Sequence, residues 1–264
     1  MSKAKQQRTT VELPDEKAEM LEMSLLEHLN DLRKRGTWAA GILFVATIIS
    51  FLFAEPLLNF LLVPYANSAA NGAQLQALRP TESIETFFKV ALLSGSILSM
   101  PFILLQFWLF ISPGLTKVER RYIYVFIPSA LLLFVLGISF AWLVLVPAAV
   151  FFLANFLPEI FRADWQGQEY ISFLITMLFW VGVSFEMPVI VYFVSRVGLV
   201  TAKTLREQWR MAIVAIAVIA AAITPSIDPV TMLLTMSPLV VLYIMSIGLA
   251  VIGQRQFERS MAVE

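Results

Sequence analysis

Residues 122–150 read YIYVFIPSALLLFVLGISFAWLVLVPAAV, a stretch without a single charged side chain. A helix needs about 20 apolar residues to cross the roughly 30 Å hydrocarbon core of a bilayer, so this stretch is long enough to span a membrane. The rest of the chain has the same character, since 59% of its 264 residues are hydrophobic and only 14% are charged. Soluble globular domains contain about 45–50% apolar and about 25% charged residues. The sequence therefore predicts an integral membrane protein.

Apolar stretches on both sides of residues 122–150 predict an all-α membrane protein with six transmembrane helices. The expected spans cover residues 37–53, 87–111, 122–150, 171–194, 211–223 and 230–252. Together they form one membrane domain, residues 22–253, between a disordered polar tail, 1–21, and a cytoplasmic tail, 254–264. The fifth and sixth spans are expected to be short. As a helix, residues 211–223 extend only about 20 Å, so we expect the bilayer to thin beside them.

The placement of basic residues predicts the orientation of the spans. The chain carries 19 lysine and arginine residues against 19 acidic residues, and this balance argues against nucleic acid as a partner. Only Arg79, Lys89 and Arg162 lie in or beside the connections on one side of the membrane; the other sixteen basic residues lie on the opposite side. Because cytoplasmic loops are enriched in lysine and arginine, both termini are expected in the cytoplasm.

Two segments outside the spans also have recognisable patterns. In residues 22–35, Leu25, Leu29 and Leu32 recur at helical spacing, which predicts an amphipathic helix on the cytoplasmic membrane surface. The first external loop, residues 54–83, contains an apolar stretch ended by Pro64. We expect one or two short helices there, covering the outer face.

The composition argues against an enzyme and against a cofactor or metal site. The chain has no cysteine and one histidine, His28, so multi-histidine and thiolate metal sites are excluded. A serine protease needs a base beside its serine, and His28 lies outside the spans. No phosphate-binding or dinucleotide-binding glycine motif occurs. A membrane enzyme would therefore have to depend on His28.

Glu186 is the only acidic residue well inside an apolar span. A carboxyl group in hydrocarbon must face a polar cavity, find a partner or stay protonated, and such groups usually have a function. The structural alternative is a hydrogen bond to backbone that Pro188 leaves unpaired, since proline lacks an N–H. Glu186 also suggests a second function for the chain, a proton-coupled secondary transporter of a small solute. The absence of matched repeats in the two halves argues against that function.

Acidic and hydroxyl side chains near the ends of the spans provide further candidates. Thr224 and Asp228 flank the turn after the short fifth span, where they either present polar groups unusually deep or simply cap the turn. At the cytoplasmic side, Asp31 and Glu119 could each accept an arginine guanidinium in a two-donor arrangement. The alternative for these two carboxylates is that they are merely solvated, as charges beside spans commonly are.

The sequence resembles the TatC family, the multispanning core of the twin-arginine protein translocase, from about residue 20 to residue 253. Motifs at separate places carry the resemblance, in the expected order: LEHLNDLRKR (26–35), Pro64, FWLFISPGL (107–115), ERR (119–121), FEMP (185–188), TP (224–225) and DP (228–229). The resemblance implies a non-enzymatic subunit of the bacterial or archaeal cytoplasmic membrane. It would bind the twin-arginine signal peptides of folded preproteins. It would work with single-span partners of the TatA and TatB type and with further copies of itself, using the proton-motive force.

The family resemblance also implies residue roles. Asp31 and Glu119 would bind the paired arginines. Arg33 and Arg121 would orient these two carboxylates or shape the loop, and Phe110 would pack beneath the loop. Glu186 would lie on a concave face open to lipid or peptide. Pro64 would shape the outer loop, while the short fifth span with Thr224, Asp228 and Thr231 would dock partners. Two positions depart from the family pattern: Asp31 stands where glutamate is usual, and Met232 where glutamine is frequent.

Overall fold

The computed structural model describes residues 25–68, 75–111, 117–160, 164–224 and 228–261, so the predicted disordered tail lies outside the described residues. Within these ranges the regular structure is helical, apart from one isolated bridge between Gln76 and Gln166. Five helical stretches are long and apolar enough to cross a membrane: Leu29–Leu52, Glu82–Phe110, Phe126–Ala154, Gly167–Arg196 and Pro229–Glu258. The all-α membrane architecture is therefore confirmed. A sixth crossing would have to use the shorter apolar helix Trp209–Ile223.

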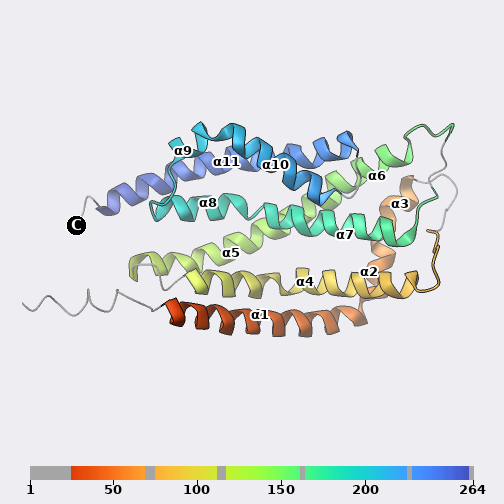
Figure 1. Cartoon of the computed structure of the whole chain (residues 1–264), viewed down its shortest axis with the longest axis horizontal. Helices are drawn as coiled ribbons and strands as arrows, with labels where there is room; N and C mark the ends of the chain where they lie inside the picture. Colours follow the sequence, from red (N-terminus) through yellow and green to blue (C-terminus); the bar gives the residue numbers. More distant parts are fainter. Residues whose placement is uncertain (1–24, 69–74, 112–116, 161–163, 225–227, 262–264) are drawn as a thin grey trace, which may run out of the picture.

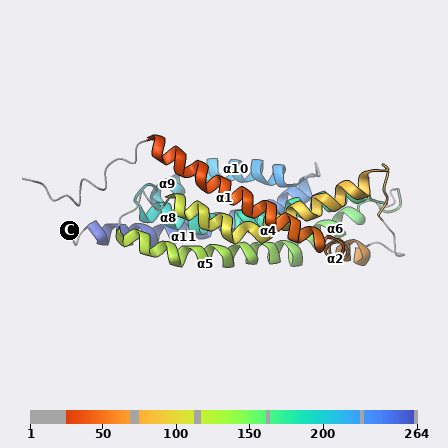
Figure 2. The same ribbon diagram turned by 90° about the horizontal axis from the view of Figure 1, so that it is seen from below.

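Helices α1 (Leu25–Leu52) and α4 (Glu82–Ile111) lie side by side along one edge of the molecule (Figure 1). They cross at an angle (Figure 2) and approach each other closely at Gly95, where a Cβ atom would lie 2.6 Å from the Cα of Thr47. The helix predicted for residues 22–35 is present from Leu25, but it is not separate from the first span, because α1 continues without a break through both. Gly36 between the two parts lowers helix propensity by about 1 kcal/mol but does not end a helix.

Two short helices, α2 (Ala54–Leu61) and α3 (Val63–Ser68), follow α1 at one end of the molecule (Figure 1). They confirm the short helices predicted for the first external loop. Pro64 follows this apolar stretch and is the second residue of α3, where its missing N–H does not prevent the helix from starting. Its side chain is buried, and its carbonyl accepts a 2.9 Å hydrogen bond from the Ser68 hydroxyl.

Prolines also interrupt the two central spans. The third span consists of α5 (Lys117–Phe140), a π-helical turn (Ala141–Leu145) and α6 (Val146–Ala154). The fourth consists of α7 (Gly167–Ser184) and α8 (Met187–Arg196). Pro147 and Pro188 stand just inside α6 and α8, and each removes one N–H from the helical ladder at the point where the regular α-helix is interrupted.

The C-terminal part contains α9 (Ala202–Glu207), α10 (Trp209–Ile223) and α11 (Pro229–Met261). Helix α10 is short, as predicted. The prediction of a short sixth span is wrong, because α11 has 33 residues and continues well beyond residue 252. Contacts with α8 explain this extension, since Tyr192 donates a 2.7 Å hydrogen bond to Gln256, and Arg196 also donates to that amide.

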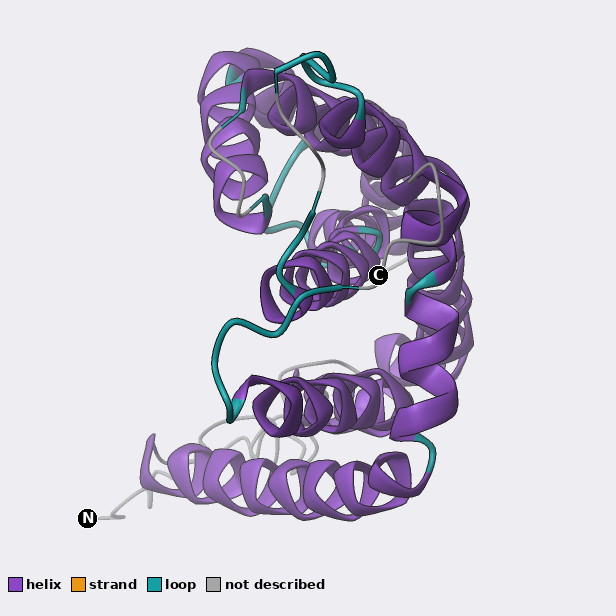
Figure 3. Ribbon diagram, turned by 90° about the vertical axis from the view of Figure 1, so that its right-hand side faces the viewer, coloured by secondary structure: helices purple, strands orange, loops and turns teal. Residues whose placement is uncertain are grey.

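The helices do not close into a compact bundle. Viewed along the long axis, they follow an arc that is open on one side (Figure 3). The first turn of α1 and the last turn of α11 lie at the same end of the molecule, and α2 and α3 lie at the opposite end (Figure 1). We refer to these as the terminal end and the cap end.

Candidate functional site

Asp31 lies near the start of α1 and is held by an arginine one turn later. The Nε of Arg35 donates a 2.7 Å hydrogen bond to Oδ2 of Asp31. Both side chains are partly buried, with 18% of Asp31 and 24% of Arg35 exposed. Within the described chain the Oδ1 atom of Asp31 makes no hydrogen bond. The carboxylate is thus held through Oδ2, while Oδ1 has no partner among the described residues.

The expected role of Arg33 beside Asp31 is not seen. Residues two positions apart point to different sides of a helix, whereas residues four apart are neighbours. Accordingly Arg35, and not Arg33, contacts Asp31, and the Arg33 side chain is exposed. No role was predicted for Arg35, although an acid and a base four residues apart in one helix commonly form an ion pair.

The remaining residues expected around the paired arginines come from the end of α4 and the start of α5. Phe110 is the second-last residue of α4 and is partly buried. Glu119 and Arg121 belong to the first turns of α5, and their side chains lie outside what the structure describes. These two helix ends lie at the terminal end, as does the start of α1 (Figure 1). The backbone thus brings all the segments of the predicted site to one end of the molecule.

Trp108 anchors the end of α4, a role that sequence reasoning missed. Its side chain is 1% exposed. The indole stacks on Phe126 of α5 at 5.4 Å between ring centroids and meets Phe193 of α8 edge-on at 4.8 Å. Aromatic pairs in these geometries stabilise packing beyond their buried area. The end of α4 is therefore held against α5 and α8, which positions the segment carrying Phe110.

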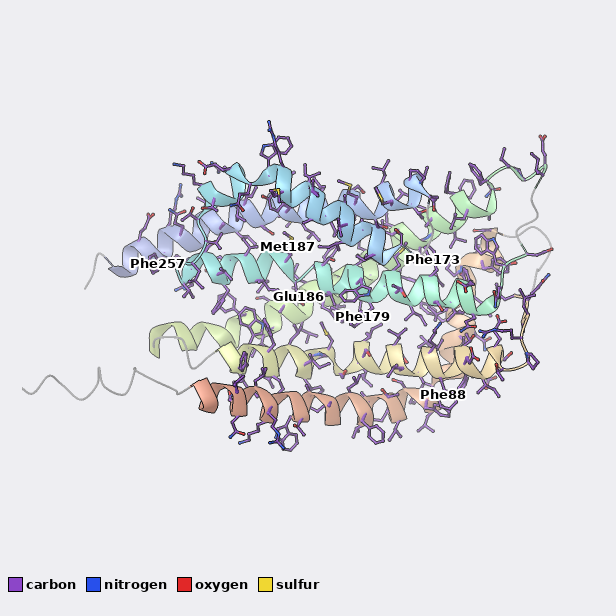
Figure 4. All side chains as sticks on the ribbon, in the orientation of Figure 1. Phe88, Phe173, Phe179, Glu186, Met187 and Phe257 are labelled. Carbon is purple, nitrogen blue, oxygen red and sulfur yellow. The ribbon has the colours of Figure 1, made fainter. Side chains whose placement is uncertain are left out.

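Glu186 lies at the break between α7 and α8, about half-way along the molecule (Figure 4). Its side chain is 3% exposed, and neither carboxyl oxygen has a hydrogen-bond partner in the described part of the chain. The expected exposure to lipid or peptide is thus wrong for this structure, because side chains of the same chain cover the group. The alternative of a hydrogen bond from Glu186 to unpaired backbone beside Pro188 is not seen either.

The polar residues after the short fifth span act as caps. Both oxygens of Asp228 face Thr231 at the start of α11: the backbone N–H of Thr231 donates to Oδ1 at 2.7 Å, and its hydroxyl donates to Oδ2. Thr224 is buried, and its hydroxyl donates to the Ala220 carbonyl at 2.7 Å. This is the capping arrangement that the turn chemistry indicated, with Asp228 satisfying backbone at a helix start.

Glu82, at the cap end, is a second residue that sequence reasoning missed. Its carboxylate is 1% exposed and accepts hydrogen bonds from four nitrogens. These are the backbone N–H groups of Leu78 (2.8 Å), Arg79 (3.3 Å) and Gln168 (3.0 Å) and the side-chain amide of Gln166 (2.9 Å). The residue joins the loop before α4 to the start of α7. Gln166 and Gln168 lie 84 and 86 positions away, so no local pattern indicated these two contacts.

Comparison with known proteins gives the family. A family model described as Sec-independent protein translocase protein (TatC) matches residues 27–238. The chain belongs to the TatC family. A TatC from Koribacter versatilis is 37% identical over 231 residues, which cover 86% of this chain and 85% of that protein. A tatC-like protein from Gracilaria tenuistipitata is 38% identical over 222 residues, covering 84% and 91% of the two chains.

A solved TatC structure has the same fold. The crystal structure described as the twin arginine translocase receptor TatC aligns with a TM-score of 0.79 at 33% identity, covering 86% of this chain and 99% of that one. The chain is thus a multi-pass membrane protein of a family whose members are components of the Tat protein translocase. These matches favour a translocase subunit over the solute transporter.

Proposed function

We propose that this TatC-family chain binds the twin-arginine signal peptides of folded preproteins at its terminal end. The observation that carries the proposal is the Asp31–Arg35 pair, which fixes one carboxylate oxygen and leaves the other open. A bound carboxylate of this kind can accept a second guanidinium, because its two oxygens offer about four lone-pair sites. A free carboxylate would first have to lose rotamer freedom.

Two consecutive arginines of the peptide would pair with Asp31 and Glu119. Arg33, Arg121 and Phe110 would shape the surrounding surface. Arginine presents a planar fork of donors, whereas lysine is a point charge, so a fixed carboxylate favours arginine by geometry. Asp31 has one methylene fewer than the glutamate usual in the family, and the bound peptide would therefore lie closer to α1.

Peptide binding tests this proposal. Titration of a labelled twin-arginine signal peptide should show weaker binding to Asp31→Ala and Glu119→Ala, by at least tenfold for the double variant. Glu207→Ala is a matched control, because Glu207 is also an acid paired with a base four residues away, Lys203 at 3.8 Å. Equal binding by the double variant and the control, or equal binding of a twin-lysine peptide to the wild type, would refute the site.

We further infer six crossings with both termini in the cytoplasm of a bacterial or archaeal membrane. The support is that α1 starts and α11 ends at the same end of the molecule (Figure 1), and that the basic residues gather on that side. The chain contains no cysteine, so single introduced cysteines report on one position each. In sealed cells a membrane-impermeant thiol reagent should label Ala77→Cys and not Lys203→Cys. Labelling of Lys203→Cys and not of Ala77→Cys would indicate the opposite orientation in the membrane.

Single-span partners of the TatA and TatB type would dock beside α10, in a process driven by the proton-motive force. Helix α10 has 15 residues and extends about 22 Å, less than the roughly 30 Å core. Its outer surface includes Val214 and Val218, which are 58% and 65% exposed. The end of this surface would be fixed by Thr224, Asp228 and Thr231. Pro64 would shape the short helices of the cap end. Glu186 would act within the membrane. A photo-crosslinker at Val218 should capture a small single-span protein, and one at buried Ile216 should not.

A further inference from the structure

One face of α1 carries basic residues followed by an apolar groove. Near the start of the helix, a hollow of about 560 Å³ is lined by Asn30, Arg33, Lys34, Thr37, Trp38 and Gly41. A second hollow, of about 650 Å³, continues from the shared residues Trp38 and Gly41 along α1 to Ile49. The spacing of these residues by three and four positions places them on one side of the helix. We call this continuous surface the α1 stripe.

The basic part of the α1 stripe has no partner within the described chain. Arg33 and Lys34 are exposed, and neither makes an ion pair with a described residue. At 100° per residue, Asp31 lies about 160° around the helix from Arg33 and about 60° from Lys34, and its carboxylate pairs with Arg35. Arg33 and Lys34 therefore present two adjacent positive charges that no described acid pairs with. An anion is the ligand that matches them.

The apolar part of the stripe is a groove between α1 and α4. Ile42, Val45, Ala46 and Ile49 line one side, and Leu98 and Phe102 of α4 line the other. Gly41, at the junction with the basic hollow, has nothing within 4 Å of the position that a Cβ would occupy. From Trp38 to Ile49 the groove runs for about 16 Å, close to half of the roughly 30 Å hydrocarbon core. That half is the depth of one leaflet.

We propose that the α1 stripe binds one anionic phospholipid, with its phosphate at Arg33 and Lys34 and one acyl chain in the groove. The groups of a lipid complement the stripe in the same order: a negative headgroup beside the basic residues, the interfacial region beside Trp38, and an apolar chain in the groove. Basic clusters at the membrane surface attract anionic headgroups, and tryptophan is enriched at that interface. Trp38 is 62% exposed and stands between the two hollows.

The lipid site differs from the proposed peptide site in position and in charge. Lys34 and the groove belong to the lipid site alone, and Arg33 borders both sites. The two basic residues attract the phosphate of a lipid, whereas the arginines of a peptide pair with the carboxylates of Asp31 and Glu119. The lipid proposal does not depend on peptide binding, because it stands on the groove between α1 and α4. The two proposals can therefore fail separately.

Native mass spectrometry of the full chain in neutral detergent tests the lipid site. The protein is titrated with phosphatidylglycerol or with phosphatidylcholine carrying the same acyl chains. Phosphatidylglycerol should bind more tightly, and Lys34→Gln should weaken its binding about fivefold, the contribution expected of one basic residue near an anionic lipid. Gly41→Leu should weaken the binding of both lipids, because the leucine side chain fills the junction between the two hollows.

Gly36→Leu is the matched control for Gly41→Leu. Gly36 lies on the same helix, also has nothing within 4 Å of a Cβ and does not line either hollow. It should bind lipid like the wild type, and both variants should unfold at or above the wild-type temperature, because leucine has a higher helix propensity than glycine. Three results would overturn the proposal: equal binding of the two lipids, equal binding by the two leucine variants, or displacement of the lipid by equimolar glycerol phosphate. Loss of twin-arginine peptide binding in Gly41→Leu alone would assign the groove to the peptide instead.

Discussion

The Nε atom of Arg35 lies 2.7 Å from Oδ2 of Asp31, one turn earlier in α1, and both side chains are partly buried. This pair fixes the plane of the carboxylate that we propose to bind a signal-peptide arginine. A fixed plane matters for a bidentate guanidinium and matters little for an ammonium group. The structure therefore connects the arginine preference of the proposed site to Arg35.

Replacing Arg35 by alanine should reduce the preference for twin-arginine over twin-lysine peptides. The reduction should not exceed about fivefold, since partly exposed ion pairs contribute at most about 1 kcal/mol. The ratio of the two peptide affinities is the measurement. Lys34→Ala removes a neighbouring positive charge without touching Asp31, and it should leave the ratio unchanged. An unchanged ratio of the two affinities in Arg35→Ala would show that Arg35 does not contribute to the arginine preference.

Replacing Glu82 by alanine should loosen the cap end. The substitution removes the acceptor of two partly buried hydrogen bonds, those from the backbone N–H groups of Leu78 and Gln168. A hydrogen bond to a charged group contributes about 1.5–3 kcal/mol. We expect a lower unfolding temperature and faster hydrogen exchange at these two amides. Glu85→Ala serves as the comparison, because 41% of the Glu85 side chain is exposed and its pairing with Arg79 is at the surface. Similar exchange in both variants would contradict the role given to Glu82.

Replacing Gly95 by valine should separate α1 from α4. Any Cβ at this position would lie 2.6 Å from the Thr47 Cα, and backbone atoms cannot move aside as a flexible side chain can. Overpacking of this kind typically costs about 1–3 kcal/mol. Thermal unfolding in detergent should show the loss for Gly95→Val and none for Gly41→Val, whose surroundings are open. Wild-type stability of Gly95→Val would mean that the two helices do not cross at this point.

Replacing Glu186 by leucine should stabilise the fold and impair export. The carboxyl group is buried without a partner among the described residues, and removing an unsatisfied polar group should raise stability by about 1–3 kcal/mol. Residues that reduce stability are commonly kept for function. Unfolding temperature and export of a twin-arginine reporter are the two measurements. Glu169→Leu, an exposed acid in the same span, should change neither. A less stable Glu186→Leu protein would point to an internal partner for the carboxyl group.

The bilayer should be thinner beside α10 than elsewhere around the protein. A helix of 15 residues extends about 22 Å, and exposed apolar side chains on it keep the hydrocarbon in contact. Spin-labelled or simulated lipids beside Val214 should report a reduced thickness. The lipids beside α4, which has 30 residues, provide the internal comparison. Equal thickness at both places would contradict the expected deformation.

The sequence alone was sufficient for the class of the protein, the family and most of the helices. Crossing a bilayer requires about 20 apolar residues in a row, and this requirement is local, so it can be seen in stretches such as residues 122–150. The position at which a helix ends depends less on local sequence. Only contacts of Tyr192 and Arg196 with Gln256 show why α11 continues past its apolar run.

The details of the candidate sites depended on tertiary structure. The partner of Asp31 was readable from spacing within one helix, because Arg35 lies one turn away. The burial of Glu186, the four donors around Glu82 and the close approach of Gly95 to Thr47 were not, because each depends on how separate helices pack. A sequence determines which segments become membrane helices through their own hydrophobicity. Only packing decides which of their faces meet, and so which polar groups are covered, paired or left open to a ligand.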